Sequence, residues 1–362
     1  MLSAIRYFCS HGVTGSIFCM HAAHFFPSRA KTSRYASTMT REKTTPSNHR
    51  ERRRAVLVAL GAALAGAALP AWAKFQPDQF RIGYQKAAST LVLLKANGAL
   101  EKRLAPQGIK VTWNEFPAGP QLLEGLNVGA IDFGYVGEAP PVFAQAAGAD
   151  FVYSAYELPT PHAEGVVVAK QSPIRSVADL KGKKIGLNRG SDVHWFLVAL
   201  LQQHGLGMHD VQTVWLAPAD ARAALQSSAI DAWAIWDPFL AAVQAQDGAR
   251  LVADASGVAS HHQFFLSQRE FAQKRGEVIA IALDELGKTG QWVRQNTAAA
   301  AAQLAPIQGL DAAIIETGLK HYAHEYRPID AAVLADQQKI ADTFYDLKII
   351  PRKVVTKDAV LA

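Results

Sequence analysis

Three loops of this sequence carry residues suited to binding an anion. The first, residues 83–90, reads GYQKAAST, in which Gln85 offers a side-chain amide and Ser89 or Thr90 is suited to cap the next helix. A helix N-terminus presents free N–H groups and the positive end of the helix dipole to an anion. An ordinary capped turn has the same features, so this loop by itself leaves binding and structure as alternatives.

The second loop, residues 137–141, starts with Gly137, which permits close approach of the backbone, and continues through Glu138 and Ala139 into two prolines. The Glu138 carboxylate would repel an anion, so we expect its backbone N–H to be the donor. Its side chain is then free to take an amine of a zwitterionic ligand or to pair across a cleft. A capped helix start is again the structural alternative.

The third loop, residues 188–195, contains Gly190 and Ser191 at the start of a helix, which is a further nest of N–H groups. Asp192 complements the helix dipole. His194 is either a ligand-binding residue or a packing residue, and a lone histidine near a helix start is more often the latter.

A tryptophan-rich segment, residues 231–238, differs in kind from these loops. In a strand, Trp233 and Trp236 point to opposite faces, and we assign Trp233 to the core. Trp236 and Asp237 fall at the carboxyl end of the strand, where a ligand belongs. The Trp236 ring is suited to form the pocket wall against the alkyl part of a small organic anion.

Signatures of catalysis are absent from residues 74–362. There is no Gly-x-Ser-x-Gly elbow, His-Glu-x-x-His helix or phosphate-binding P-loop. Of the histidines, His261 and His262 are adjacent, so their rings should point to opposite faces of a strand, and His321 and His324 have no convincing third ligand. We expect structural or surface roles for all four, with no catalytic residue, metal or cofactor.

The charge and the cysteines of the chain divide at residue 73. Residues 1–73 hold ten Lys/Arg and two acids, whereas residues 74–362 hold 27 Lys/Arg and 29 acids, so the net charge of +6 arises from the first part. Nucleic-acid binding is therefore not expected, because it needs a basic face on the folded domain. Cys9 and Cys19 also lie in the first part, which excludes a disulfide framework or a thiol nucleophile downstream.

Residues 50–73 have the order of a secretory signal peptide. Four arginines precede a small-apolar run over residues 55–69, and an Ala-Trp-Ala sequence ends at Ala73. The run is short for a membrane anchor, so we expect export to the periplasm with cleavage near Ala73. Sec and twin-arginine export both remain open. Met39 offers a better start, and residues 1–49 are expected to be an over-long start or a disordered extension.

The mature chain alternates strands with helices in two runs, which predicts an α/β fold with two lobes and parallel sheets covered by helices. We expect strands at residues 80–84, 111–116, 131–136, 151–156, 165–169, 184–188, 211–216, 230–236, 250–253 and 263–267. Long helices are expected at residues 91–104 and 278–295, and the part after residue 269 should be almost purely helical. Strands 165–169 and 263–267 are the expected crossings, so lobe 1 comprises residues 74–164 and 263–362, and lobe 2 residues 165–262.

The sequence resembles the periplasmic aliphatic-sulfonate-binding proteins of ABC importers over essentially the whole mature chain. Eight blocks match in the same order, at residues 80–86, 100–106, 115–124, 127–132, 137–141, 177–184, 218–224 and 231–238. Two positions depart from the usual pattern: the family has a small residue where this chain has Asp192, and often Asp in place of Glu138.

The resemblance implies a two-lobe periplasmic binding fold that closes on a sulfonate without chemistry and delivers it to an inner-membrane permease, as a monomer. It places the sulfonate near Gln85, the Gly137–Glu138 turn, the Gly190–Ser191 helix start and Trp236. Taurine, nitrate or another small anion remains an alternative ligand. A pyrimidine-precursor synthase-like enzyme and a sensor domain remain alternative functions.

Overall fold

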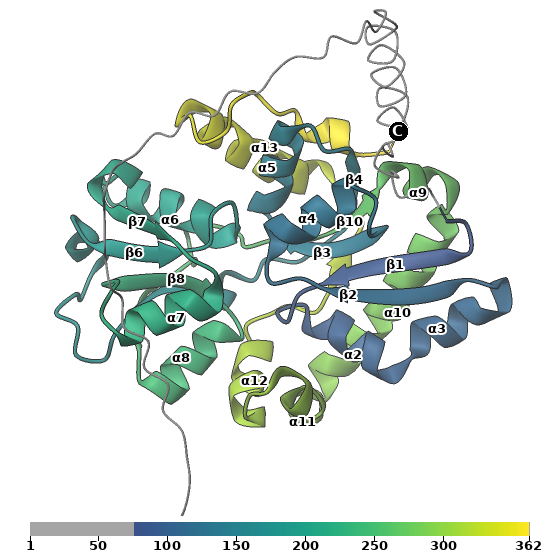
Figure 1. Cartoon of the computed structure of the whole chain (residues 1–362), viewed down its shortest axis with the longest axis horizontal. Helices are drawn as coiled ribbons and strands as arrows, with labels where there is room; N and C mark the ends of the chain where they lie inside the picture. Colours follow the sequence, from purple (N-terminus) through teal and green to yellow (C-terminus); the bar gives the residue numbers. More distant parts are fainter. Residues whose placement is uncertain (1–75, 362) are drawn as a thin grey trace, which may run out of the picture. The chain divides into compact units, whose positions relative to one another are not determined.

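The computed structural model describes residues 76–361, so the signal-peptide and extension predictions lie outside the described residues. Figure 1 shows two sheets with helices packed around them. The strands are β1 (Gln79–Tyr84), β2 (Lys110–Glu115), β3 (Phe133–Gly137), β4 (Phe151–Glu157), β5 (Glu164–Val168), β6 (Lys184–Leu187), β7 (Gln212–Trp215), β8 (Ala232–Trp236), β9 (Arg250–Asp254), β10 (Gln263–Gln268) and β11 (Tyr326–Arg327).

The helices follow most strands, as the alternating pattern predicts. They are α2 (Ser89–Asn97), α3 (Ala99–Leu104), α4 (Gly119–Asn127), α5 (Ala139–Ala147), α6 (Asp192–Gln203), α7 (Pro218–Gln226), α8 (Phe239–Asp247), α9 (Arg269–Lys274), α10 (Gly276–Gln295), α11 (Thr297–Gln308), α12 (Ala312–Leu319) and α13 (Ala331–Asp346). The single helix expected at residues 91–104 is in fact two, because Gly98 takes the left-handed φ of 62° and ends α2.

The expected α/β class is confirmed, but the expectation of parallel sheets is wrong for β10 and the short β11 in one sheet and for β5 in the other. The six-stranded sheet has the order β11-β4-β10-β3-β1-β2, and β10 lies antiparallel between β3 and β4. The five-stranded sheet has the order β7-β6-β8-β5-β9, and β5 lies antiparallel to both neighbours. The chain reaches β5 and β10 directly from the other sheet, so no crossover helix imposes a parallel direction on these two strands.

Two short segments join the sheets, residues 158–163 between β4 and β5 and residues 255–262 between β9 and β10. They are hydrogen-bonded side by side, since the Thr160 N–H donates to the Ser260 carbonyl (3.0 Å) and the Ala255 N–H to the Pro161 carbonyl (3.1 Å). We call these two segments the crossing pair. The two connections between the sheets therefore lie side by side as one hydrogen-bonded pair of segments.

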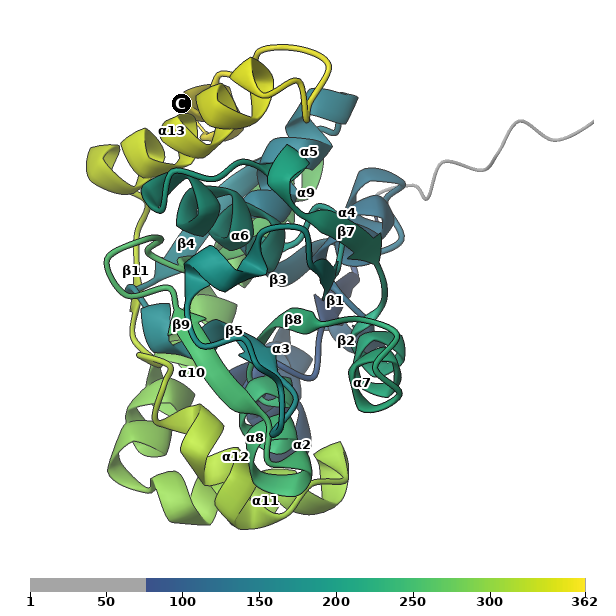
Figure 2. The same ribbon diagram turned by 90° about the vertical axis from the view of Figure 1, so that its left-hand side faces the viewer.

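Separate apolar cores stabilise the two sheets. One core centres on Phe80, Phe133 and Phe265 of the six-stranded sheet, and another on Trp233 and Phe196 around the five-stranded sheet. Trp233 is therefore a core residue, in line with the face assigned to it from the sequence. A smaller apolar cluster packs α5 and α6 against α13, which lies at the top of Figure 2.

Within residues 76–361, no single helix is long and apolar enough to cross a membrane. The pair α11 and α12, bent by 119°, meets the length and composition criteria only when taken together. Buried residues of both helices, including Ala300, Leu304, Ile315 and Leu319, belong to the core beside the six-stranded sheet. The apolar character of this pair is accounted for by that packing.

Candidate functional site

The carboxyl ends of β1, β3, β6 and β8 carry the loops singled out in the sequence, and they surround a hollow of about 320 Å³, part of it open to solvent. We call this space the inner hollow. It is lined by Gln85, Ala87, Gly119, Tyr135, Gly137, Pro140, Ser191, Asp192, Trp236, His261, Gln263 and Tyr322. Five of the ten predicted site residues, namely Gln85, Gly137, Ser191, Asp192 and Trp236, therefore line one space.

A second space of about 670 Å³, the outer hollow, adjoins the first. The two share Gln85, Ala87 and Trp236 in their linings. The outer hollow adds Lys86 and the apolar side chains of Phe116 and Phe239. Together the two hollows form one cleft with a shared wall. The indole of Trp236 in this wall comes from the five-stranded sheet, and the amide of Gln85 comes from the loop after β1 of the six-stranded sheet.

Asp192 is the first residue of α6, yet its carboxylate reaches the start of α5 on the other side of the cleft. Its Oδ1 accepts from the Ala139 N–H (3.3 Å) and its Oδ2 from Gln263 Nε2 (3.4 Å). A Cβ atom at Gly137 would lie 1.6 Å from Asp192 Oδ2, so only glycine leaves room for this approach. The carboxylate thus occupies the helix start where the sequence led us to expect an anion.

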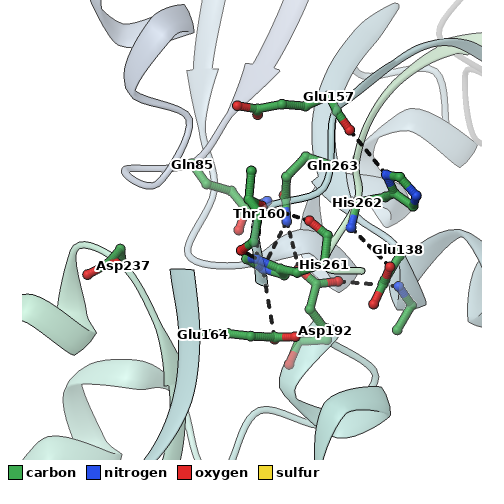
Figure 3. A network of polar contacts seen from close by, with 12 residues as sticks. Gln85, Glu138, Glu157, Thr160, Glu164, Asp192, Asp237, His261, His262 and Gln263 are labelled. Carbon is green, nitrogen blue, oxygen red and sulfur yellow. Dashed lines mark hydrogen bonds and ion pairs between the residues drawn. The ribbon is translucent and has the colours of Figure 1, made fainter. Parts of the chain in front are cut away.

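His261, in the crossing pair, is the basic partner of this carboxylate (Figure 3). Its Nε2 lies 3.7 Å from Asp192 Oδ2 and 3.8 Å from Glu164 Oε2, while Nδ1 lies 3.0 Å from the Thr160 carbonyl. Burial lowers the pKa of His261, but the charges of Glu164 and Asp192 outweigh burial and raise it to about 10. The ring is therefore an imidazolium at neutral pH.

Glu138 and Glu164 complete an acidic cluster behind His261. Burial raises the pKa of Glu138 to about 8, and burial raises that of Glu164 well above its usual value. Glu138 Oε2 accepts from the backbone N–H of His262 (3.0 Å), and the side chain does not line the inner hollow. Neither oxygen of Glu164, which is fully buried, has a hydrogen-bond partner.

Of the predicted residues of the third loop, some line the inner hollow and others lie outside it. Gly190 has the left-handed φ of 77°, and its N–H donates to His194 Nδ1 (3.3 Å). Ser191 lines the inner hollow, whereas His194 packs between Phe143 and Trp215 outside it. Burial lowers the pKa of His194 to about 4, so its neutral ring can accept that hydrogen bond.

At the end of β8, Trp236 and Asp237 also divide. Trp236 lines both hollows, but Asp237 is buried away from them and stands apart from the polar network in Figure 3. Its Oδ1 accepts from the Ala241 N–H (2.9 Å) at the start of α8, and Oδ2 lies 2.6 Å from His321 Nδ1. These contacts tie the five-stranded sheet to the segment after α12.

Sequence reasoning missed several lining residues, notably Tyr135, His261, Gln263 and Tyr322. His261 was expected to have a structural or surface role; it is buried and lies within hydrogen-bond distance of Thr160, and it also lies in the wall of the inner hollow. Residues 76–361 contain no group of three histidine, cysteine or acidic side chains arranged to hold a metal ion.

Comparisons with known proteins identify the family. A family model described as NMT1/THI5 like matches residues 104–300. A relative from Escherichia coli, named for binding aliphatic sulfonates, is 43% identical over 303 residues, which cover 83% of this chain and 94% of the relative. This chain belongs to the family of aliphatic-sulfonate-binding proteins.

Solved structures of this family match the fold described above. The alkanesulfonate-binding protein SsuA from Xanthomonas axonopodis pv. citri, bound to MOPS, is 43% identical with a TM-score of 0.76, covering 80% of this chain and 99% of that one. The periplasmic aliphatic sulphonate binding protein SsuA from Escherichia coli is also 43% identical, with a TM-score of 0.73 and coverages of 79% and 93%. The predicted family and two-sheet α/β architecture are thereby confirmed.

Proposed function

We propose that this protein is the solute-binding component of an ABC importer and captures a small organic sulfonate without chemical change. The observation that carries the proposal is the cleft itself, which combines an apolar indole wall with backbone and amide donors and lies at the carboxyl ends of the central strands. The similarity to a relative bound to MOPS, a sulfonate, over 99% of that relative's length supports the ligand class.

The predicted site residues enter this proposal in two groups. Gln85, Gly137, Ser191, Asp192 and Trp236 are proposed to contact the ligand, because they line the inner hollow. The others are proposed to hold these contacts in place. They are Glu138, Ala139, Gly190, His194 and Asp237, which bond to the backbone or to the lining residues.

The two-lobe division remains part of the proposal. Lobe 1 comprises residues 74–164 and 263–362, and lobe 2 comprises residues 165–262. The strand memberships of the two sheets support these limits, although β5 begins one residue earlier, at Glu164. The crossing pair acts as the hinge, and closure about it dries the cleft, which strengthens each hydrogen bond to a charged oxygen.

The cellular context is likewise proposed. Export to the periplasm with cleavage near Ala73 follows from the order of residues 50–73. The protein then acts as a monomer that presents its closed form to an inner-membrane permease. Taurine and nitrate remain the alternative ligands, since a taurine-binding relative is 27% identical over 202 residues.

Isothermal titration calorimetry of the purified protein against a series of alkanesulfonates, taurine, nitrate and sulfate tests the proposal. We expect micromolar or tighter binding of at least one sulfonate. Trp236→Ala should weaken that binding at least about tenfold by removing the shared wall, and Trp236→Phe should restore part of it. Absence of binding to every sulfonate, with a nitrate or sulfate signal in its place, would contradict the ligand class.

A further inference from the structure

The cation that lines the inner hollow is already paired with a carboxylate of the protein. Among the twelve described residues that line this space, Asp192 and His261 are the charged ones, and there is no lysine or arginine. His261 Nε2 lies 3.7 Å from Asp192 Oδ2. An anion that enters the hollow therefore meets an imidazolium whose charge Asp192 already matches.

The same carboxylate also occupies two hydrogen-bond donors of the kind that bind an anion. Asp192 Oδ1 accepts from the Ala139 N–H at the start of α5 (3.3 Å), and Oδ2 accepts from Gln263 Nε2 (3.4 Å). A helix start offers free N–H groups and the positive end of the helix dipole to an anion. Figure 3 shows the Asp192 side chain beside His261 and Gln263. Asp192 therefore holds the place that a bound anion would need.

Two other polar side chains of the lining are bound within the protein at shorter distances. The Gln85 amide donates to the Tyr135 carbonyl (3.1 Å), and the Ser191 hydroxyl donates to the Asn188 carbonyl (2.7 Å). The contacts of Asp192, at 3.3 to 3.7 Å, exceed the usual N–H···O distance of about 2.9–3.0 Å. They are thus weaker contacts, which a ligand with better geometry can replace.

Asp192 reaches its donors from the opposite side of the cleft. It is the first residue of α6, which follows β6 of the five-stranded sheet, whereas Ala139 follows β3 and Gln263 begins β10 of the six-stranded sheet. Its carboxylate fits there because Gly137 has no Cβ, which would lie 1.6 Å from Oδ2. A side chain of the protein thus bridges the two sheets where the ligand is proposed to bind.

We propose that the Asp192 carboxylate acts as an internal anion, which occupies the donors of the inner hollow in the ligand-free protein and must be displaced when a sulfonate is captured. Asp192 is then a lining residue that competes with the ligand. Its removal frees the Ala139 N–H, the Gln263 amide and the His261 imidazolium for the sulfonate oxygens. This inference rests on the proposed capture of a sulfonate and identifies the group that limits its affinity.

Asp192→Ala should raise the affinity for a short alkanesulfonate, which is the opposite of the effect of losing a ligand contact. If the carboxylate occupies its donors in about nine of ten ligand-free molecules, it lowers the apparent affinity about tenfold. We therefore expect the variant to bind ethanesulfonate at least about tenfold more tightly than the wild-type protein in calorimetry. Tris is the buffer, because it contains no sulfonate.

Asp336→Ala is the matched control. It removes the same charge from an exposed carboxylate that lies 3.7 Å from His262 Nε2, outside the lining of the inner hollow. Its affinity for ethanesulfonate should stay within about twofold of the wild-type value, because exposed charges have small effects.

His261→Asn tests which cation the sulfonate meets. Asparagine tolerates the left-handed φ of 51° at residue 261, and it removes the positive charge. In the Asp192→Ala background this change should abolish most of the gain in affinity. Asp192→Ser takes the place of Asp192→Ala if the latter fails to fold, as judged by circular dichroism.

An affinity that is unchanged or weaker in the Asp192 variants would overturn the inference, as would a gain that survives His261→Asn in full. Both outcomes leave the proposed sulfonate capture standing, because the wild-type protein still binds. Binding of no alkanesulfonate by the wild-type protein or by any variant would instead refute the proposed function, and this inference with it.

Discussion

Gly137→Ala tests whether the Asp192 carboxylate really lies against the start of α5. The new Cβ would be 1.6 Å from Oδ2 and 2.0 Å from Cγ of Asp192, whereas unstrained heavy atoms stay about 3.5 Å apart. The carboxylate must therefore move by about 2 Å, out of reach of the Ala139 N–H and Gln263. Overpacking of this kind costs about 1–3 kcal/mol, and we expect the free energy of unfolding of the variant to be lower by about 2 kcal/mol.

The double variant Gly137→Ala/Asp192→Ala removes the obstacle, so the two changes should not add. Urea unfolding of the wild type, both single variants and the double variant gives their coupling, which we expect at about 1.5 kcal/mol or more. Gly276→Ala is the control, since its Cβ would meet nothing within 4 Å, and it should change stability by less than about 0.5 kcal/mol. Additive effects of the single variants within about 0.5 kcal/mol would refute the contact.

Three other predictions concern buried ionisable groups. Burial lowers the pKa of His194 to about 4, whereas the unfolded residue protonates near 6.5. The free energy of unfolding should therefore fall as the pH drops from 6.5 to 4. His194→Phe should reduce that fall, as measured by urea midpoints from about pH 7 to 4. The His261 ring should remain protonated at pH 8 in nitrogen-15 NMR, and Glu164→Gln should lower its pKa, because the Glu164 charge helps to raise it to about 10; an unchanged pKa would contradict their proximity. Asp132→Ala should lower the free energy of unfolding by about 3–5 kcal/mol in urea, because the Arg81 guanidinium, 2.5 Å from Asp132 Oδ1, loses its partner. A loss below about 1 kcal/mol would be inconsistent with that ion pair.

The positions of the elements could be predicted well from the sequence because apolar periodicity determines which residues face a core. The expected strand at residues 80–84 is β1 (Gln79–Tyr84), and the expected helix at residues 278–295 is α10 (Gly276–Gln295). Strand direction could not be predicted in the same way. The pattern of side chains in β5 and β10 is compatible with either direction, and the direction depends on the route of the chain between the sheets.

Residues that line the inner hollow could be predicted where a loop follows a strand, and were missed where distant segments meet. Gln85, Ser191 and Trp236 lie at or just after the carboxyl ends of strands, where ligands bind in open α/β sheets. His261 and Gln263 line the same hollow only because β10 returns to the six-stranded sheet beside β3. Their histidine and amide side chains gave no local signal that distinguished a wall of the cleft from a structural position.

Asp192, and not Glu138, is the acidic side chain that lines the inner hollow beside His261. Burial raises the pKa of Glu138 to about 8, so this carboxyl group is mostly neutral at pH 7, and it lies behind the wall. Glu164, whose pKa burial also raises, lies 3.8 Å from His261 Nε2, on the side away from the hollow. Both donors to Asp192, the Ala139 N–H and the Gln263 amide, come from the side of the six-stranded sheet, opposite the helix that carries Asp192. Because the His261 imidazolium, 3.7 Å from Asp192 Oδ2, lines the same hollow, the charge of Asp192 is already matched before a ligand enters.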